Sequence, residues 1–172
     1  RGSVAEQRLA TLAGLGAVRR LRGSLETFGL PEDGFFEINF RLAQKEAQFQ
    51  EAVLLAHELR FNVSADDGVV TPGQAVTVSA QIANHGETAV AVSQVRFHGF
   101  SNDDLPCGAD ILVSGGVYQC QSPLRLPETA RTTDVHWQRL PGAARYQFDP
   151  DVPFGLPFRL TPFRASFELE FS

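Results

Sequence analysis

The chain has 172 residues and a net charge of −5, and 43% of its residues are hydrophobic. That apolar fraction is ordinary for a folded globular protein and excludes an intrinsically disordered chain. The acidic excess lies in residues 61–172, which disfavours nucleic-acid binding because an acidic surface repels phosphates. No run approaches the roughly 20 apolar residues that span a bilayer.

The first residues do not form a signal sequence, and the chain contains no methionine. We therefore expect a piece of a longer product that is secreted or periplasmic, with its targeting segment upstream.

Two helices are predicted in residues 1–60. Leucine and valine recur at helical spacing over residues 4–27, where Gly14 and Gly16 suggest close packing against a neighbour. Gly29 and Pro31 end this helix, and a second helix follows at about residues 37–59. The short connection between them predicts an antiparallel helical hairpin.

From residue 61 the period changes to two, which is typical of half-buried strands. We expect strands near 61–65, 75–84, 89–97, 111–113, 117–120, 124–126, 146–148 and 163–171, with a bulge between Val92 and Val95. The predicted fold is mainly β: an N-terminal helical hairpin followed by an antiparallel Ig-like β-sandwich over residues 61–172.

Cys107 and Cys120 are the two cysteines, thirteen residues apart. In an oxidising compartment they would close a loop, which in the chain-entropy model stabilises by about 3 kcal/mol. Two buried free thiols are the alternative, and the sequence leaves both open.

Residues able to hold a metal form no recognised pattern. The four histidines make neither HxxH nor HExxH, so no metal site is predicted in this chain. Acidic pairs at Asp66-Asp67, Asp103-Asp104 and Asp149/Asp151 are read as turn formers, with calcium binding as the alternative. There is no GxSxG motif, so no catalytic residue is predicted.

The densest group of aromatic and charged residues lies in 136–157. The candidate ligand-binding residues there are His136, Trp137, Arg139, Tyr146 and Asp149. Such a set suits a carbohydrate or peptide, but the single tryptophan of an Ig-like domain is usually a core residue. We favour the core interpretation of Trp137 and keep the ligand site as the alternative.

Several segments over residues 36–172 resemble the region downstream of the catalytic domain in large bacterial PIG-L (LmbE-like) deacetylases. These are Phe40-Arg41-Leu42-Ala43-Gln44-Lys45-Glu46 with Phe49 and Ala52, Ala65-Asp66-Asp67-Gly68-Val69-Val70-Thr71-Pro72-Gly73-Gln74, Ile82-Ala83-Asn84-His85-Gly86, His136-Trp137-Gln138-Arg139, Tyr146-Gln147-Phe148-Asp149 and Phe154-Gly155-Leu156-Pro157.

That family removes N-acetyl groups from amino sugars with zinc held by an AHPDD motif and a later HxxH. Neither motif occurs here, since Ala56-His57-Glu58-Leu59 lacks the aspartates. The resemblance therefore implies a zinc-dependent N-deacetylase as the parent protein and a non-catalytic role, without a cofactor, for this chain.

Three hypotheses follow. The first is an accessory module that positions glycan substrate or braces an upstream catalytic domain. The second is a structural interaction module, such as a homodimer formed through the helices. The third, an independent hydrolase, lacks a recognisable site.

Overall fold

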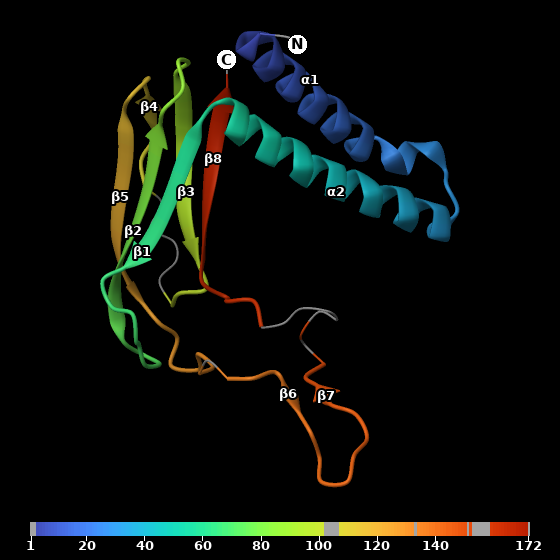
Figure 1. The fold of residues 1–172 in the computed structure, drawn as a ribbon, viewed down its shortest axis with the longest axis vertical. Helices are drawn as coiled ribbons and strands as arrows, with labels where there is room; N and C mark the ends of the chain where they lie inside the picture. Colours follow the sequence, from blue (N-terminus) through green and yellow to red (C-terminus); the bar gives the residue numbers. More distant parts are fainter. Residues whose placement is uncertain (1–2, 102–106, 133, 151, 153–158, 172) are drawn as a thin grey trace.

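The computed structural model describes residues 3–101, 107–132, 134–150, 152 and 159–171. Two helices at the N-terminus form a hairpin, and antiparallel sheets of strands follow them (Figure 1). This confirms the predicted fold class. Of the helices in the described part of the chain, none is both long and apolar enough to cross a membrane.

The predicted helices and strands follow one another in the expected order, and the structure adds a short strand at 137–138 that was not predicted. The elements are α1 (Val4–Gly23), a 3-10 turn η1 (Leu25–Phe28), α2 (Glu32–Ala56), β1 (Leu59–Ala65), β2 (Ala75–Asn84), β3 (Val90–His98), β4 (Asp110–Leu112), β5 (Val117–Arg125), β6 (Trp137–Gln138), β7 (Gln147–Phe148) and β8 (Arg164–Phe171).

The first helix begins at a capping box. The Ser3 hydroxyl accepts a hydrogen bond from the Glu6 amide, and the Glu6 carboxylate accepts one from the Ser3 amide. After η1, Gly29 adopts the left-handed conformation that turns the chain, and Pro31 stands at the start of α2. The chain turns at Gly29 and Pro31 as predicted, but α1 itself ends earlier than predicted, at Gly23, and η1 fills the interval. The second helix also begins and ends earlier than expected.

Ion pairs join the two helices across one face. Glu46 of α2 binds Arg19 at 3.0 Å and Arg22 at 2.9 Å, both on α1. Hydrogen bonds from Arg22 and then Arg19 hold the pKa of the Glu46 carboxyl below its usual value. Within α2, Glu37 and Arg41 form an ion pair one helical turn apart at 2.6 Å.

The helices also approach closely at Gly14. A Cβ added there would lie 2.7 Å from Cζ of Phe49 on α2, so the aromatic ring occupies the space a side chain would need. At Gly16 an added Cβ would meet only the flexible end of Arg20, at 3.2 Å. The predicted close packing is therefore found at Gly14 and not at Gly16.

These two glycines give a matched pair of substitutions. We expect Gly14→Ala to lower the free energy of unfolding by about 1–2 kcal/mol, because displacing Phe49 costs more than the helix propensity gained. Gly16→Ala is expected to raise it by up to about 1 kcal/mol, since alanine favours helix. Urea unfolding of both variants tests this, and two changes of the same sign would contradict the packing difference.

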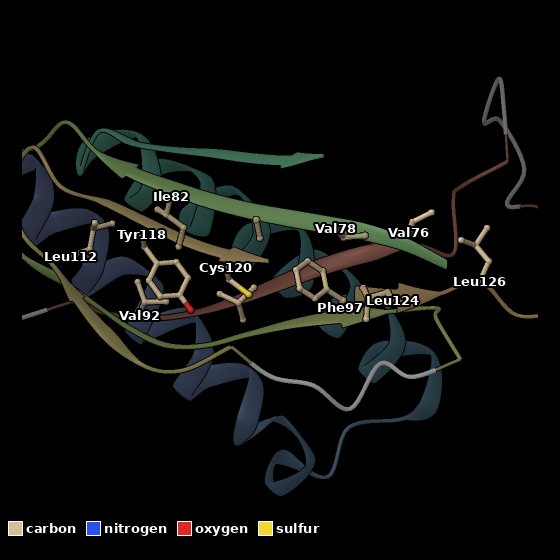
Figure 2. Close-up of a cluster of buried hydrophobic side chains, with 12 residues drawn as sticks. Val76, Val78, Ile82, Val92, Phe97, Leu112, Tyr118, Cys120, Leu124 and Leu126 are labelled. Atoms are coloured by element: carbon tan, nitrogen blue, oxygen red, sulfur yellow. The ribbon is translucent and has the colours of Figure 1, made fainter. Parts of the chain in front are cut away.

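Two three-stranded antiparallel sheets form the sandwich, with strand orders β1-β2-β5 and β4-β3-β8. Figure 2 shows side chains of both sheets gathered in the space between them. In β2 the apolar residues that alternate along the strand, Val76, Val78, Ala80 and Ile82, are all buried, as the period of two predicts. On β8 the alternating apolar residues are half-buried, while the polar residues between them are exposed.

Two details of the strand prediction had different outcomes. The predicted bulge is confirmed, since the register between β3 and β8 shifts between Val92 and Gln94. The two strands expected at 117–120 and 124–126 are one continuous strand, β5. Pro123, which has no N–H, is tolerated there because β5 is an edge strand.

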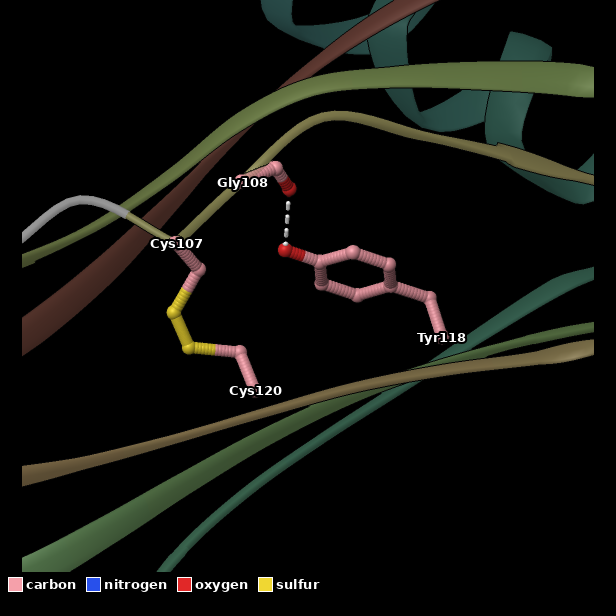
Figure 3. Close-up of a disulfide and its surroundings, with 4 residues drawn as sticks. All are labelled: Cys107, Gly108, Tyr118 and Cys120. Atoms are coloured by element: carbon pink, nitrogen blue, oxygen red, sulfur yellow. Dashed lines mark hydrogen bonds between the residues drawn. A yellow bond between two sulfur atoms is a disulfide. The ribbon is translucent and has the colours of Figure 1, made fainter.

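A disulfide between Cys107 and Cys120 joins the segment before β4 to β5 (Figure 3). Beside it, the Tyr118 hydroxyl donates a hydrogen bond to the Gly108 carbonyl at 2.8 Å. Burial, together with the nearby charge of Asp110, raises the pKa of this tyrosine. The disulfide crosses between the two sheets, because Cys107 forms a β-bridge with Val95 of β3 while Cys120 lies in β5 of the other sheet.

The helical hairpin meets one end of the sandwich at a polar junction. Buried Arg8 of α1 donates to the carbonyl of Ala56 at 3.0 Å and lies 3.4 Å from Glu87 in the β2–β3 turn. A cation at this position stabilises the C-terminal carbonyls of α2. Buried His57 packs its ring 4.5 Å from that of Phe171 at the end of β8.

Candidate ligand-binding site

The candidate residues lie on a small hairpin that extends away from the sandwich (Figure 1). In it β6 pairs with β7, with Trp137 opposite Phe148 and Gln138 opposite Gln147. The Asp149 amide donates to the carbonyl of His136 at 2.8 Å and so extends the pairing. His136, Trp137 and Asp149 therefore lie at the paired end of one hairpin, while Arg139 directly follows β6 and Tyr146 directly precedes β7.

The turn of this hairpin is held by local bonds. The Ala143 amide donates to the Leu140 carbonyl at 3.0 Å, and Gly142 has a positive φ of 79°. Arg139 donates through Nε to the Ala143 carbonyl at 3.1 Å. The Arg139 side chain thus helps to shape the turn while remaining exposed.

Trp137 and Tyr146 form an exposed aromatic pair. Their ring centroids lie 5.0 Å apart with an interplanar angle of 84°, an edge-to-face contact. Trp137 is 40% exposed and Tyr146 is 53% exposed, and neither belongs to the buried core cluster. The favoured expectation that Trp137 is a core residue is therefore wrong, because the core closes on β2, β3, β5 and β8 without the hairpin.

Polar groups accompany this pair. His136 is only 2% exposed, its ring lies 5.8 Å from that of Phe148, and its Nε2 has no hydrogen-bond partner among the described residues. Asp149 forms ion pairs with Arg159 and, at 3.6 Å, with Arg131. The site thus offers two aromatic rings beside a buried imidazole and a charged cluster.

Sequence reasoning missed both arginine partners of Asp149. They lie ten and eighteen residues from it, in segments without regular structure, so no spacing pattern connects them to the hairpin. The only signal was the number of charged residues around position 149, which does not identify pairs.

The other three histidines do not join this site. His57 lies at the helix junction, His85 in the β2–β3 turn, and His98 beside Ser166 on the outer face of the second sheet. In the part of the chain that the structure describes, no three His, Cys, Asp or Glu side chains gather as a metal site would require.

The acidic pair Asp66-Asp67 accepts hydrogen bonds from its own surroundings. Asp66 accepts from the Thr77 amide, and Asp67 from the Val69 amide and the Gln74 side chain. The Val69 amide and then the Gln74 side chain lower the pKa of the Asp67 carboxyl. These bonds match the turn-forming interpretation. Asp103, Asp104, Asp151 and the segment 154–157 lie outside the described residues.

No protein-family model and no curated protein sequence match the chain. Among solved structures, the crystal structure of Spo0M, a sporulation control protein from Bacillus subtilis, is similar with 14% sequence identity and a TM-score of 0.32. The match covers 45% of this chain and 38% of that one. A likeness this weak supports no conclusion about function and does not bear on the resemblance to the deacetylases.

Proposed function

We propose that this chain is a non-catalytic accessory module of a PIG-L (LmbE-like) N-deacetylase, and that its β6–β7 hairpin positions the glycan substrate. The observation that carries the proposal is the exposed pair of Trp137 and Tyr146 on a hairpin outside the core. The sequence resemblance supplies the parent enzyme, whose catalytic domain would hold the zinc. The helical hairpin would link and brace that upstream domain.

Sugars suit such a surface. Each sugar ring has an apolar C–H face that packs on an aromatic ring, while its hydroxyl and acetamido groups need hydrogen-bond partners. Trp137 and Tyr146 offer the rings. Asp149 and Arg139 offer an acceptor and donors within the same hairpin.

Calorimetric titration with N-acetylglucosamine oligomers tests the binding. We expect saturable binding that Trp137→Ala weakens about tenfold or more, as truncation of a binding hot spot does. The thermal midpoint should stay nearly unchanged, because Trp137 lies outside the core cluster. Phe36→Ala, at another exposed aromatic residue, is the matched control.

Two results would count against the proposal. If the unaltered chain shows no saturable binding, or if Phe36→Ala weakens binding as much as Trp137→Ala, the hairpin is not the glycan site. The deacetylase part fails separately if the full-length product carries no upstream AHPDD domain.

A second candidate function is self-association through the helices. Phe36 and Phe40 of α2 are 69% and 51% exposed, and their stacked rings have centroids 6.3 Å apart. The two rings make a continuous apolar patch on the surface of the helical hairpin. Light scattering over a range of concentrations should then show a dimer that Phe36→Glu disrupts and Val69→Glu, at an exposed turn of the sandwich, does not. A monomer at every concentration would dismiss this candidate.

A further inference from the structure

We propose that the sandwich binds the aliphatic tail of a medium-chain carboxylate in a cavity between β1 and β8, with Arg164 at the rim to meet the carboxylate. The cavity has a volume of about 320 Å³ and opens between the two sheets on the side away from the disulfide. It is separate from the β6–β7 hairpin, so the inference does not depend on the glycan proposal.

Side-chain sizes along the two edge strands explain why space remains here. Register with β2 places Phe61, Val63 and Ala65 of β1 on the inner face of their sheet. Further along, Phe61 and Phe167 close the gap between the sheets by an edge-to-face contact at 5.1 Å. At the cavity the corresponding residues of the two strands are Ala65 and Ala165, whose methyl groups are too small to meet across it.

The walls of the cavity are apolar. Val78 and Phe97, both buried core residues, line it together with Val63. Phe100 and Phe163 add two rings in contact at 4.9 Å. A volume of this size falls at the lower end of small-ligand sites, which are mostly apolar with a few polar groups at defined places.

The residue with a full charge in this lining is Arg164, which begins the edge strand β8 on the exposed outer face of its sheet and so reaches the cavity opening around the sheet edge. It has no ion-pair partner in the part of the chain that the structure describes. A guanidinium binds carboxylate oxygens in a two-point geometry, and its aliphatic stem packs along apolar surface. An apolar cavity with one cation at its rim is complementary to a molecule with an apolar tail and an anionic head.

Chain length provides the first test. In calorimetric titrations at neutral pH with hexanoate, octanoate and decanoate, affinity should rise about fourfold for each added methylene that enters the cavity. Decanol, which has the same tail without the charge, should bind about tenfold more weakly than decanoate. Equal affinities for decanoate and decanol, or no binding of either, would overturn the proposal.

Two pairs of variants locate the site. Arg164→Gln should reduce the affinity for decanoate to that for decanol, whereas Arg96→Gln should not, because Arg96 lies on the same outer face but on the central strand β3 and outside the cavity lining. Ala65→Phe should fill the cavity and abolish binding, while Ala75→Phe, on the exposed face of β2, should not.

Ala65 and Ala75 are both exposed, so we expect both phenylalanine variants to keep the thermal midpoint of the unaltered chain. Equal midpoints would show that both variants fold. Binding that survives Ala65→Phe would overturn the site. If the carboxylates do not bind but an extended apolar peptide does, the cavity instead receives a strand added to β1, and the proposal fails. Trp137→Ala should leave decanoate binding unchanged, which separates this test from that of the hairpin.

Discussion

Asn84→Asp is expected to destabilise the chain by about 3 kcal/mol or more. Asn84 is 1% exposed, and its side-chain amide donates to the carbonyls of Thr88 at 2.8 Å and Leu112 at 3.1 Å. Its carbonyl oxygen accepts from the Gly86 amide at 3.0 Å. An aspartate keeps the acceptor but turns a buried charged oxygen toward two carbonyl oxygens, so it loses both donors and adds repulsion.

Guanidinium unfolding measures this effect, with Asn62→Asp as the matched control. Asn62 is exposed on β1, so the same chemical change there should alter the free energy of unfolding by no more than about 0.5 kcal/mol. Similar values for the two variants would mean that Asn84 does not hold the β2–β3 turn to the end of β4.

We expect Gly86→Ala to lower the free energy of unfolding by about 2 kcal/mol or more and to disturb the attachment of the helices to the sandwich. An added Cβ would overlap the carbonyl oxygen of His57 and lie 3.1 Å from its carbonyl carbon. This obstacle is backbone, and it is fixed by the buried His57 ring against Phe171 and by the hydrogen bond from the His85 amide to Glu58. The chain can accommodate the methyl only by moving the end of α2.

Gly108→Ala is the control, because an added Cβ there meets nothing within 4 Å. Thermal unfolding should separate the two variants, and small-angle scattering should show a changed overall shape for Gly86→Ala alone. A Gly86→Ala protein as stable as the Gly108→Ala protein would show that the end of α2 can move away from the β2–β3 turn at little cost in stability.

Predictions from the sequence were most accurate for strands in which apolar and polar residues alternate along the whole length. In β2 and β8 alternation identified the buried face, and the break after Val92 identified the bulge. Prediction failed at Pro123, because proline interrupts a central strand but not an edge strand, and edge position depends on distant pairing. The disulfide was left open for the same reason, since only the fold brings the Cα atoms of Cys107 and Cys120 to 6.0 Å.

The sequence predicted which residues form the candidate site, but it did not predict that the hairpin carrying them lies outside the core. Composition alone drew attention to His136, Trp137, Arg139, Tyr146 and Asp149, which the fold places on one hairpin. An analogy with Ig-like domains put Trp137 in the core, yet the two sheets fill their interior with other side chains. The hairpin is exposed because the core of the sandwich forms without any residue of it, which no local pattern reveals.

The four edge strands of the sandwich differ in how well they resist pairing with a strand of a neighbouring molecule. β5 carries Pro123, β4 is only three residues long, and β8 alternates exposed polar and charged residues with half-buried ones. β1 has neither a proline nor a short length, and its apolar residues Phe61 and Val63 are themselves exposed. Hydrogen bonds at Glu58 and Asp66 fix which β1 residues bond to β2, so the main-chain groups of Phe61 and Val63 face away from it. Aggregation on heating or at high concentration should therefore begin at β1, and a lysine on that strand would be the most direct way to suppress it.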